Sequence, residues 1–140
     1  MRAFLEADWQ YPRSRTRPNL PAAFSAVRED ASKKDNIFKA GASETLALYP
    51  VLRYFLEVAV PADCIRAERA SFLSVCHVLD LIASVKNTAR EEACRRLDAV
   101  VNEFFGLHLE AYGTELVRPK HHYMHGHLTR QVMADHFWLD

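Results

Sequence analysis

Apolar side chains recur at steps of three and four residues from position 72 to position 112, the spacing that places them on one face of an α-helix. A polar stretch divides this pattern into two segments. Asp63 precedes the first segment and is a residue type that can cap a helix. We predict helices over about 63–86 and 88–112. Because only a short connection joins them, we expect them to form a central antiparallel pair.

The ends of the second helix carry local signals of their own. Thr88 and Glu91 stand at the spacing of a capping box, in which each side chain accepts a hydrogen bond from the other's backbone N–H. Gly113 is typical of the residue that ends a helix. These signals predict where the helix begins and where it ends.

Two more helices are predicted before the central pair. Asn19 can cap a helix over about 20–33, with Pro21 in its first turn, where the missing N–H costs nothing. Ser43 is a good N-cap for the next helix, which contains Pro50. Because proline interrupts a helix, we expect a separate first turn and a main helix that restarts near Pro50 and runs to about residue 60.

A last helix over about 128–138 brings the expected number to five, and no strand pattern or hairpin turn competes with them. We therefore predict an all-α fold, a helical bundle of about five helices. A chain of 140 residues suits one domain. We place that domain at 19–140, after an extended basic arm over 1–18.

The net charge of zero is the sum of unlike regions, since eight basic and five acidic residues lie within 1–40 while seven and eleven lie within 41–117. The basic arm over 1–18 is either a linker or a segment that contacts phosphate. The second alternative predicts a nucleic-acid-binding module, whose binding should weaken steeply with salt. Its cationic residues are Arg13, Arg15, Arg17, Lys33, Lys34, Arg118 and Lys120.

Five of the seven histidines lie between positions 121 and 136. On a helix, imidazoles three or four residues apart share a face and can bind one zinc ion. The candidate ligands are His121, His122, His125 and His127, with Asp135 or Cys76. The alternative is a polar, partly buried segment whose imidazoles bond backbone carbonyls. Neutral buried histidines would then have to gain charge, so stability should fall below about pH 6.

Motifs for the common catalytic sites are absent from the sequence, which has only four glycines from which to build a P-loop or a dinucleotide-binding turn. His77 and Asp80 could serve as a base and its orienting carboxylate, but a buried hydrogen bond that fixes helix register is the favoured interpretation. His108 is expected at the edge of the core. No catalytic residue is therefore assigned, and enzymatic activity is not expected.

Cysteine content and hydropathy bear on the compartment. Cys64, Cys76 and Cys94 are an odd number within predicted helices, which indicates reduced thiols in an intracellular protein, nuclear or cytoplasmic. The uncharged stretch 70–79 is about half the length of a membrane helix, so no membrane partner is expected.

The run Val117–Tyr123, together with 38–55 and 71–81, resembles a family of uncharacterised proteins abundant in dinoflagellate algae, which look like relatives of DNA-transposon proteins. Pro119, Lys120, His121, His122 and Tyr123 match the family's Pro-Lys-His-His-aromatic signature directly. The next histidine matches His127 only with one inserted residue. The family motif usually leads on to a further segment containing Cys and His-Glu-Arg, so the resemblance implies a fragment that lacks C-terminal sequence.

Three functions follow as hypotheses. The first is a non-enzymatic helical domain with a structural or interaction role, derived from a mobile element. The second is the nucleic-acid-binding module, and the third is the histidine-based zinc site. Partners are accordingly another protein or nucleic acid. No cofactor is expected unless the histidine site binds zinc, and the sequence does not specify the oligomeric state.

Overall fold

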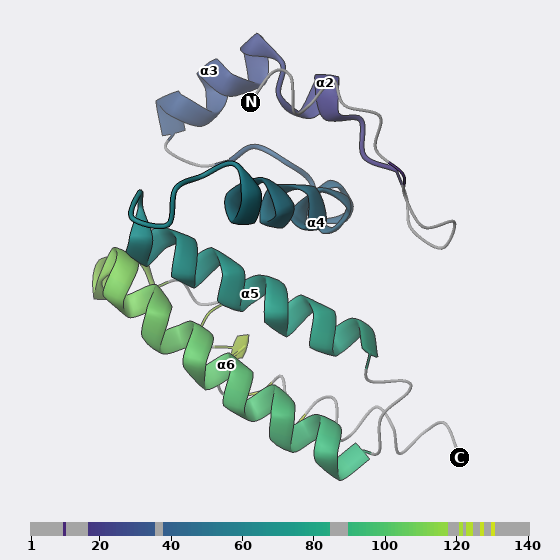
Figure 1. Ribbon diagram of the computed structural model, residues 1–140, viewed down its shortest axis with the longest axis vertical. Helices are drawn as coiled ribbons and strands as arrows, with labels where there is room; N and C mark the ends of the chain where they lie inside the picture. Colours follow the sequence, from purple (N-terminus) through teal and green to yellow (C-terminus); the bar gives the residue numbers. More distant parts are fainter. Residues whose placement is uncertain are drawn as a thin grey trace. The chain divides into compact units, whose positions relative to one another are not determined.

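The computed structural model describes residues 10, 17–35, 38–84 and 90–117, together with 121, 123, 124, 127 and 130. In this part of the chain every regular element is helical, which confirms the all-α fold class (Figure 1). The elements are α2 (Leu20–Ala23), α3 (Ala26–Asp35), α4 (Ala42–Val58), α5 (Arg66–Ser84), α6 (Arg90–Tyr112) and the 3₁₀ turn η2 (Thr114–Leu116).

These elements group into two compact units, Met1–Val60 and Pro61–Asp140, and each has a hydrophobic core of its own. The grouping does not test whether 19–140 folds as one domain, which stays a prediction. Most of the predicted basic arm and of the predicted helix over 128–138 lies outside the described residues.

The first unit starts with the predicted cap. The Asn19 Oδ1 accepts the Ala22 N–H at 3.1 Å, and Pro21 lies in the first turn of α2, as expected. This helix ends after one turn, however, so the prediction of one helix over 20–33 is wrong. The reason is that the Ser25 carbonyl accepts the Glu29 N–H at 2.9 Å and begins a new helix, α3.

Helix α4 differs from the prediction at both its start and its middle. It begins after Gly41 rather than at Ser43, and the Gly41 carbonyl accepts the Thr45 N–H at 2.8 Å. It then continues without interruption through Pro50, so the predicted break is wrong. Proline removes the hydrogen bond to the carbonyl of Leu46, and its ring crowds that carbonyl. The buried neighbours of Pro50 hold the helix together around that loss, and they are Leu48, Tyr49 and Val51.

The core of the first unit is small. Leu20 and Ala23 of α2 pack with Leu48 and Val51 of α4, and Phe24 and Leu52 lie at its margin. Helix α3, all ten residues of which are described, buries none of them.

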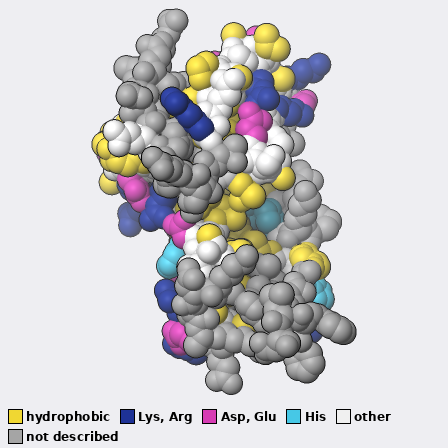
Figure 2. Space-filling model, turned by 90° about the vertical axis from the view of Figure 1, so that its right-hand side faces the viewer, with side chains coloured by type: hydrophobic (Ala, Val, Ile, Leu, Met, Phe, Trp, Pro, Cys, Tyr) yellow, Lys and Arg dark blue, Asp and Glu magenta, His cyan; other side chains and the backbone are white. Residues whose placement is uncertain are grey.

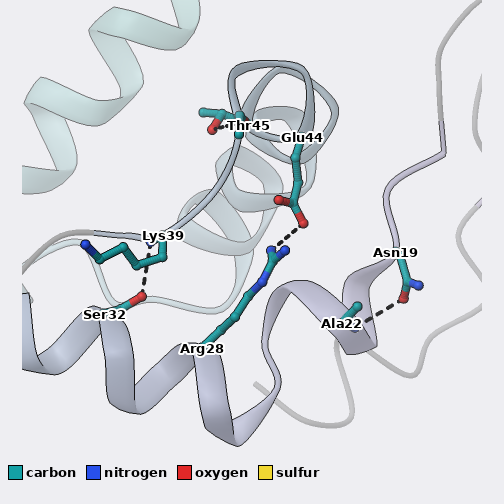
Figure 3. Close-up of polar contacts among 8 residues, drawn as sticks. Asn19, Ala22, Arg28, Ser32, Lys39, Glu44 and Thr45 are labelled. Atoms are coloured by element: carbon teal, nitrogen blue, oxygen red, sulfur yellow. Dashed lines mark hydrogen bonds and ion pairs between the residues drawn. The ribbon is translucent and has the colours of Figure 1, made fainter.

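Polar contacts connect α3 to its neighbours instead. The Arg28 Nη1 donates to the Glu44 Oε1 at 2.5 Å, and the Lys39 N–H donates to the Ser32 Oγ at 3.1 Å (Figure 3). Arg28 reaches from the first turns of α3 to the first turn of α4, so this pair spans two helices.

The second unit contains the predicted central pair, with α5 and α6 side by side and antiparallel (Figure 1). The predicted spans 63–86 and 88–112 agree with the observed helices to within about three residues. Residues spaced three and four apart on both helices form a continuous seam between them. Its buried members are Val78, Leu81, Leu97, Val101 and Phe104. Thr88 of the predicted capping box lies outside the described residues.

Asp63 does not cap α5, which corrects the prediction for that helix. The Pro61 carbonyl accepts the Cys64 N–H at 3.1 Å, so a turn occupies this stretch. The helix starts only when the Ile65 carbonyl accepts the Arg69 N–H at 2.8 Å. Cys64 is therefore exposed in the turn, outside the helix in which it was predicted.

The surface of the described residues mixes both signs of charge. Figure 2 shows dark blue Lys and Arg side chains beside magenta Asp and Glu side chains on the face in view. Cys64, Cys76 and Cys94 form no disulfide bond in the described part of the chain, and the last two are buried. Among the described helices, none combines the length and the apolar character that a membrane crossing requires.

Candidate functional site

Aromatic and imidazole rings gather where α6 ends. Phe104, His108 and Tyr112 stand four residues apart and so share one face of the helix. The ring centroids of Phe104 and His108 are 5.6 Å apart, and those of His108 and Tyr112 are 4.9 Å apart. His108 is half-buried here, which confirms the expectation that it lies at the edge of the core.

A fourth ring reaches this face from beyond the helix. Gly113 takes a left-handed conformation, with φ of 70°, and ends α6 as predicted. The turn η2 follows, closed by the Val117 N–H on the Thr114 carbonyl at 3.1 Å. The His121 ring then lies 4.3 Å from His108 and 6.2 Å from Phe104, centroid to centroid. We call Phe104, His108, Tyr112 and His121 the ring cluster.

One polar atom of the ring cluster has no hydrogen-bond partner among the described residues. The His108 Nε2 is buried, and no described group forms a hydrogen bond with it. A buried polar atom without a partner costs about 1–3 kcal/mol, so native proteins usually supply it with a hydrogen bond, a water or an ion. His108 thus presents an unused ligand nitrogen close to a second imidazole.

Tyr112 lies at the more exposed end of the ring cluster, and its side chain is only partly buried. Burial raises the pKa of its phenol, and the negative charge of Glu68 raises that pKa further. Glu68 belongs to the first turn of α5, so the start of α5 lies near the end of α6, as the antiparallel pairing requires.

The structure describes two of the predicted zinc ligands in the tail. His121 is half-buried against His108, whereas His127 is exposed with its ring centroid 5.4 Å from that of Tyr123. Cys76 is buried in α5. Within the described residues, no group of three or more His, Cys, Asp or Glu side chains could hold a metal ion. The remaining candidates, His122, His125 and Asp135, lie outside the described residues.

From the sequence, His108 is expected at the edge of the core and is not among the candidate ligands. Its four-residue spacing from Phe104 and Tyr112 was visible, but its proximity to His121 depends on the turn after Gly113. The expected fall in stability at acid pH stays a prediction, and in the described part of the tail His121 is half-buried whereas His127 is exposed.

Few of the predicted nucleic-acid-binding residues are described. Arg17 and Lys34 are exposed, and the Lys33 Nζ lies 2.7 Å from the Glu29 Oε1. The hydrogen bond in this pair raises the pKa of Lys33 and lowers the pKa of Glu29. The other four residues of the set lie outside the described part of the chain, and they are Arg13, Arg15, Arg118 and Lys120.

The interpretation of His77 and Asp80 as a buried hydrogen-bonded pair is wrong. The His77 side chain is exposed on α5, so it is not one half of a buried hydrogen bond that fixes helix register. Asp80 is half-buried on the same helix. The sequence suggested burial because His77 stands between apolar residues along α5, but its position on the helix faces solvent.

A row of exposed apolar side chains runs along α4. Leu46, Tyr54 and Val58 keep 52%, 48% and 64% of their surface exposed. They are spaced by multiples of four residues, with half-buried Pro50 between the first two, so they follow one ridge of the helix. We call these three residues the α4 ridge.

Comparisons with protein-family models, with curated proteins and with solved structures found no match to this chain. The resemblance to transposon-derived proteins of dinoflagellates therefore stays a prediction.

Proposed function

We propose that this chain is a non-enzymatic helical domain that binds another protein, and that its binding surface is the α4 ridge. The observation that carries the proposal is the exposure of Leu46, Tyr54 and Val58 in one row. Single exposed apolar residues are ordinary, but several of them along one ridge of a helix favour an interaction surface. A ridge with four-residue spacing fits the groove of another helix.

The partner that we propose is a second copy of this chain. The chain has eighteen basic and eighteen acidic residues, and a net charge of zero favours association because copies do not repel one another. Beside Tyr54, the Arg53 Nε lies 3.0 Å from the Glu57 Oε1. In an antiparallel two-fold pair centred on this part of α4, Arg53 of one copy would face Glu57 of the other.

Sedimentation velocity of the full chain over a wide range of concentration tests this proposal. We expect a dimer that dissociates on dilution. Tyr54→Glu should leave a monomer, because a charge would be buried in the interface. Val27→Glu is the matched control, since Val27 is 80% exposed on α3 and lies outside the ridge. Circular dichroism establishes that both variants are folded.

Two outcomes contradict the proposal. One is a wild-type chain that stays monomeric at every concentration. The other is a dimer that Val27→Glu weakens as much as Tyr54→Glu does.

Nucleic-acid binding stays a second prediction, and the described cations favour it less. Lys33 is paired with Glu29, and Lys39 with Asp35 at 2.5 Å, so acidic side chains lie beside these two cations of the α3 region. Fluorescence anisotropy with short duplexes and single strands tests it. Binding that is undetectable, or insensitive to salt, removes the hypothesis.

A further inference from the structure

We infer that His108 and His121 form a two-imidazole site for a divalent late transition-metal ion of the zinc class. The site differs from the one that the sequence predicted, because His108 of α6 replaces the neighbouring histidines of the tail. It is also independent of the α4 ridge, which belongs to the other compact unit.

Two separate observations support the site. The first is proximity, since the ring centroids of His108 and His121 lie 4.3 Å apart with an interplanar angle of 57°. Two imidazoles on one tetrahedral ion, each with its nitrogen about 2.0–2.1 Å from the metal, have centroids slightly more than about 5 Å apart. The observed separation is shorter, so the two rings must rotate and move apart to hold one ion between them.

The second observation is the unused nitrogen. The His108 Nε2 is buried without a hydrogen-bond partner among the described residues. Neutral imidazole nitrogen is the ligand that zinc and its neighbours in the periodic table prefer among uncharged groups. A bound ion would remove the cost of leaving this atom unpaired.

The donor set indicates what kind of binding to expect. The described residues offer no third His, Cys, Asp or Glu to complete a closed structural site. With only these two described ligands, water would fill the other positions, which is the arrangement of an open site. The affinity should accordingly be well below that of a four-ligand structural zinc site.

Metal binding would also have a structural effect. His108 lies in α6, and His121 follows the left-handed Gly113 and the turn η2. An ion held by both imidazoles would cross-link the two sides of this turn. Because Met124 packs against the core formed by α5 and α6, the cross-link would hold the start of the tail on that core.

Titration of Zn²⁺ into the full, tag-free chain tests the inference, by calorimetry and by thermal unfolding. We expect one ion per chain and a Tm that rises by about 3–10 °C with free zinc near ten times its Kd. His108→Phe should abolish both signals, because phenylalanine keeps a ring against Phe104 and Tyr112 but has no nitrogen. His121→Phe should do the same. The Tm without zinc establishes that each variant is folded.

Three control variants distinguish this site from others. His77→Ala and His127→Ala remove exposed histidines, and Cys64→Ser removes the exposed thiol, so all three should bind zinc as the wild type does. No zinc binding by the wild type would overturn the inference. Zinc binding that survives His108→Phe would also overturn the inference. If His127→Ala abolishes that remaining binding, the ion belongs to the tail site that the sequence predicted.

Discussion

The two compact units use different means to hold their helices together. In the second unit, two helices of 19 and 23 residues meet along a continuous seam of large apolar side chains. In the first unit, the core between α2 and α4 contains one alanine among its four buried members, and α3 contributes no buried residue. The two long helices of the second unit are thus held by burial, whereas α3 of the first unit relies on polar contacts.

This difference should appear as unequal costs for the same substitution. Leu97 and Leu48 are both essentially inaccessible, at 0% and 1% exposure. We expect Leu97→Ala to lower the free energy of unfolding by about 3 kcal/mol, and Leu48→Ala by about 2 kcal/mol. The smaller core leaves fewer contacts to lose and can close more easily around the cavity. Urea unfolding followed by circular dichroism measures both values.

The same experiment bears on the number of domains. If residues 19–140 fold as one domain, both variants shift one cooperative transition. Two separate transitions, each moved by one variant only, would instead define two domains. If Leu97→Ala and Leu48→Ala lower the free energy of unfolding equally, the two cores do not differ in the way proposed.

The sequence predicted the second unit better than the first. The α5–α6 pair follows from spacing that repeats over more than five turns, and Gly113 ends α6 as expected. In the first unit, the helix boundaries depend on single local interactions that the apolar spacing does not specify. Ser25 begins α3 without any glycine or proline to mark it, and the packing around Pro50 overrides the tendency of proline to break a helix.

The ring cluster was only partly predictable, for a different reason. The set Phe104, His108 and Tyr112 follows from helix periodicity. The approach of His121 depends on how Gly113 and η2 reverse the chain, and spacing along the sequence does not specify that path. The His108 Nε2 lacks a hydrogen-bond partner among the described residues, and this too depends on three-dimensional packing.

Substitution of Pro50 tests how far packing compensates for poor local propensity in the first unit. Pro50→Ala allows residue 50 to donate a hydrogen bond to the Leu46 carbonyl and removes an unfavourable residue from the helix interior. The unfolded chain gains freedom, which offsets part of this benefit. We expect a net gain of about 1 kcal/mol in urea unfolding. Unchanged or lower stability would mean that α4 requires the proline.

The ion pair between α3 and α4 should contribute less than either core. The Arg28 and Glu44 side chains are 37% and 25% exposed, so solvent screens their attraction only in part. We expect Arg28→Ala to cost about 0.5–1 kcal/mol, as measured by urea unfolding. Lys33→Ala is the matched control on the same helix, and because its pair with Glu29 is more exposed, its cost should be smaller. If Lys33→Ala lowers the free energy of unfolding as much as Arg28→Ala does, the contact between the two helices is not what stabilises α3.

The smallest expected effect lies at alkaline pH, in the second unit. Burial, with the charge of Glu68, raises the pKa of Tyr112 above its usual value of 10.0 in the folded state. Folding therefore favours the neutral phenol, and this contribution is complete below pH 10 and is lost as pH rises through the raised pKa. Tyr112 is 39% exposed, so the loss should be modest. Tyr112→Phe has no proton to lose, so the stability of the wild type should fall relative to this variant between about pH 10 and pH 12. Unfolding curves for the two proteins across that range measure the difference, and parallel curves would show that the folded and unfolded states hold the Tyr112 proton equally well.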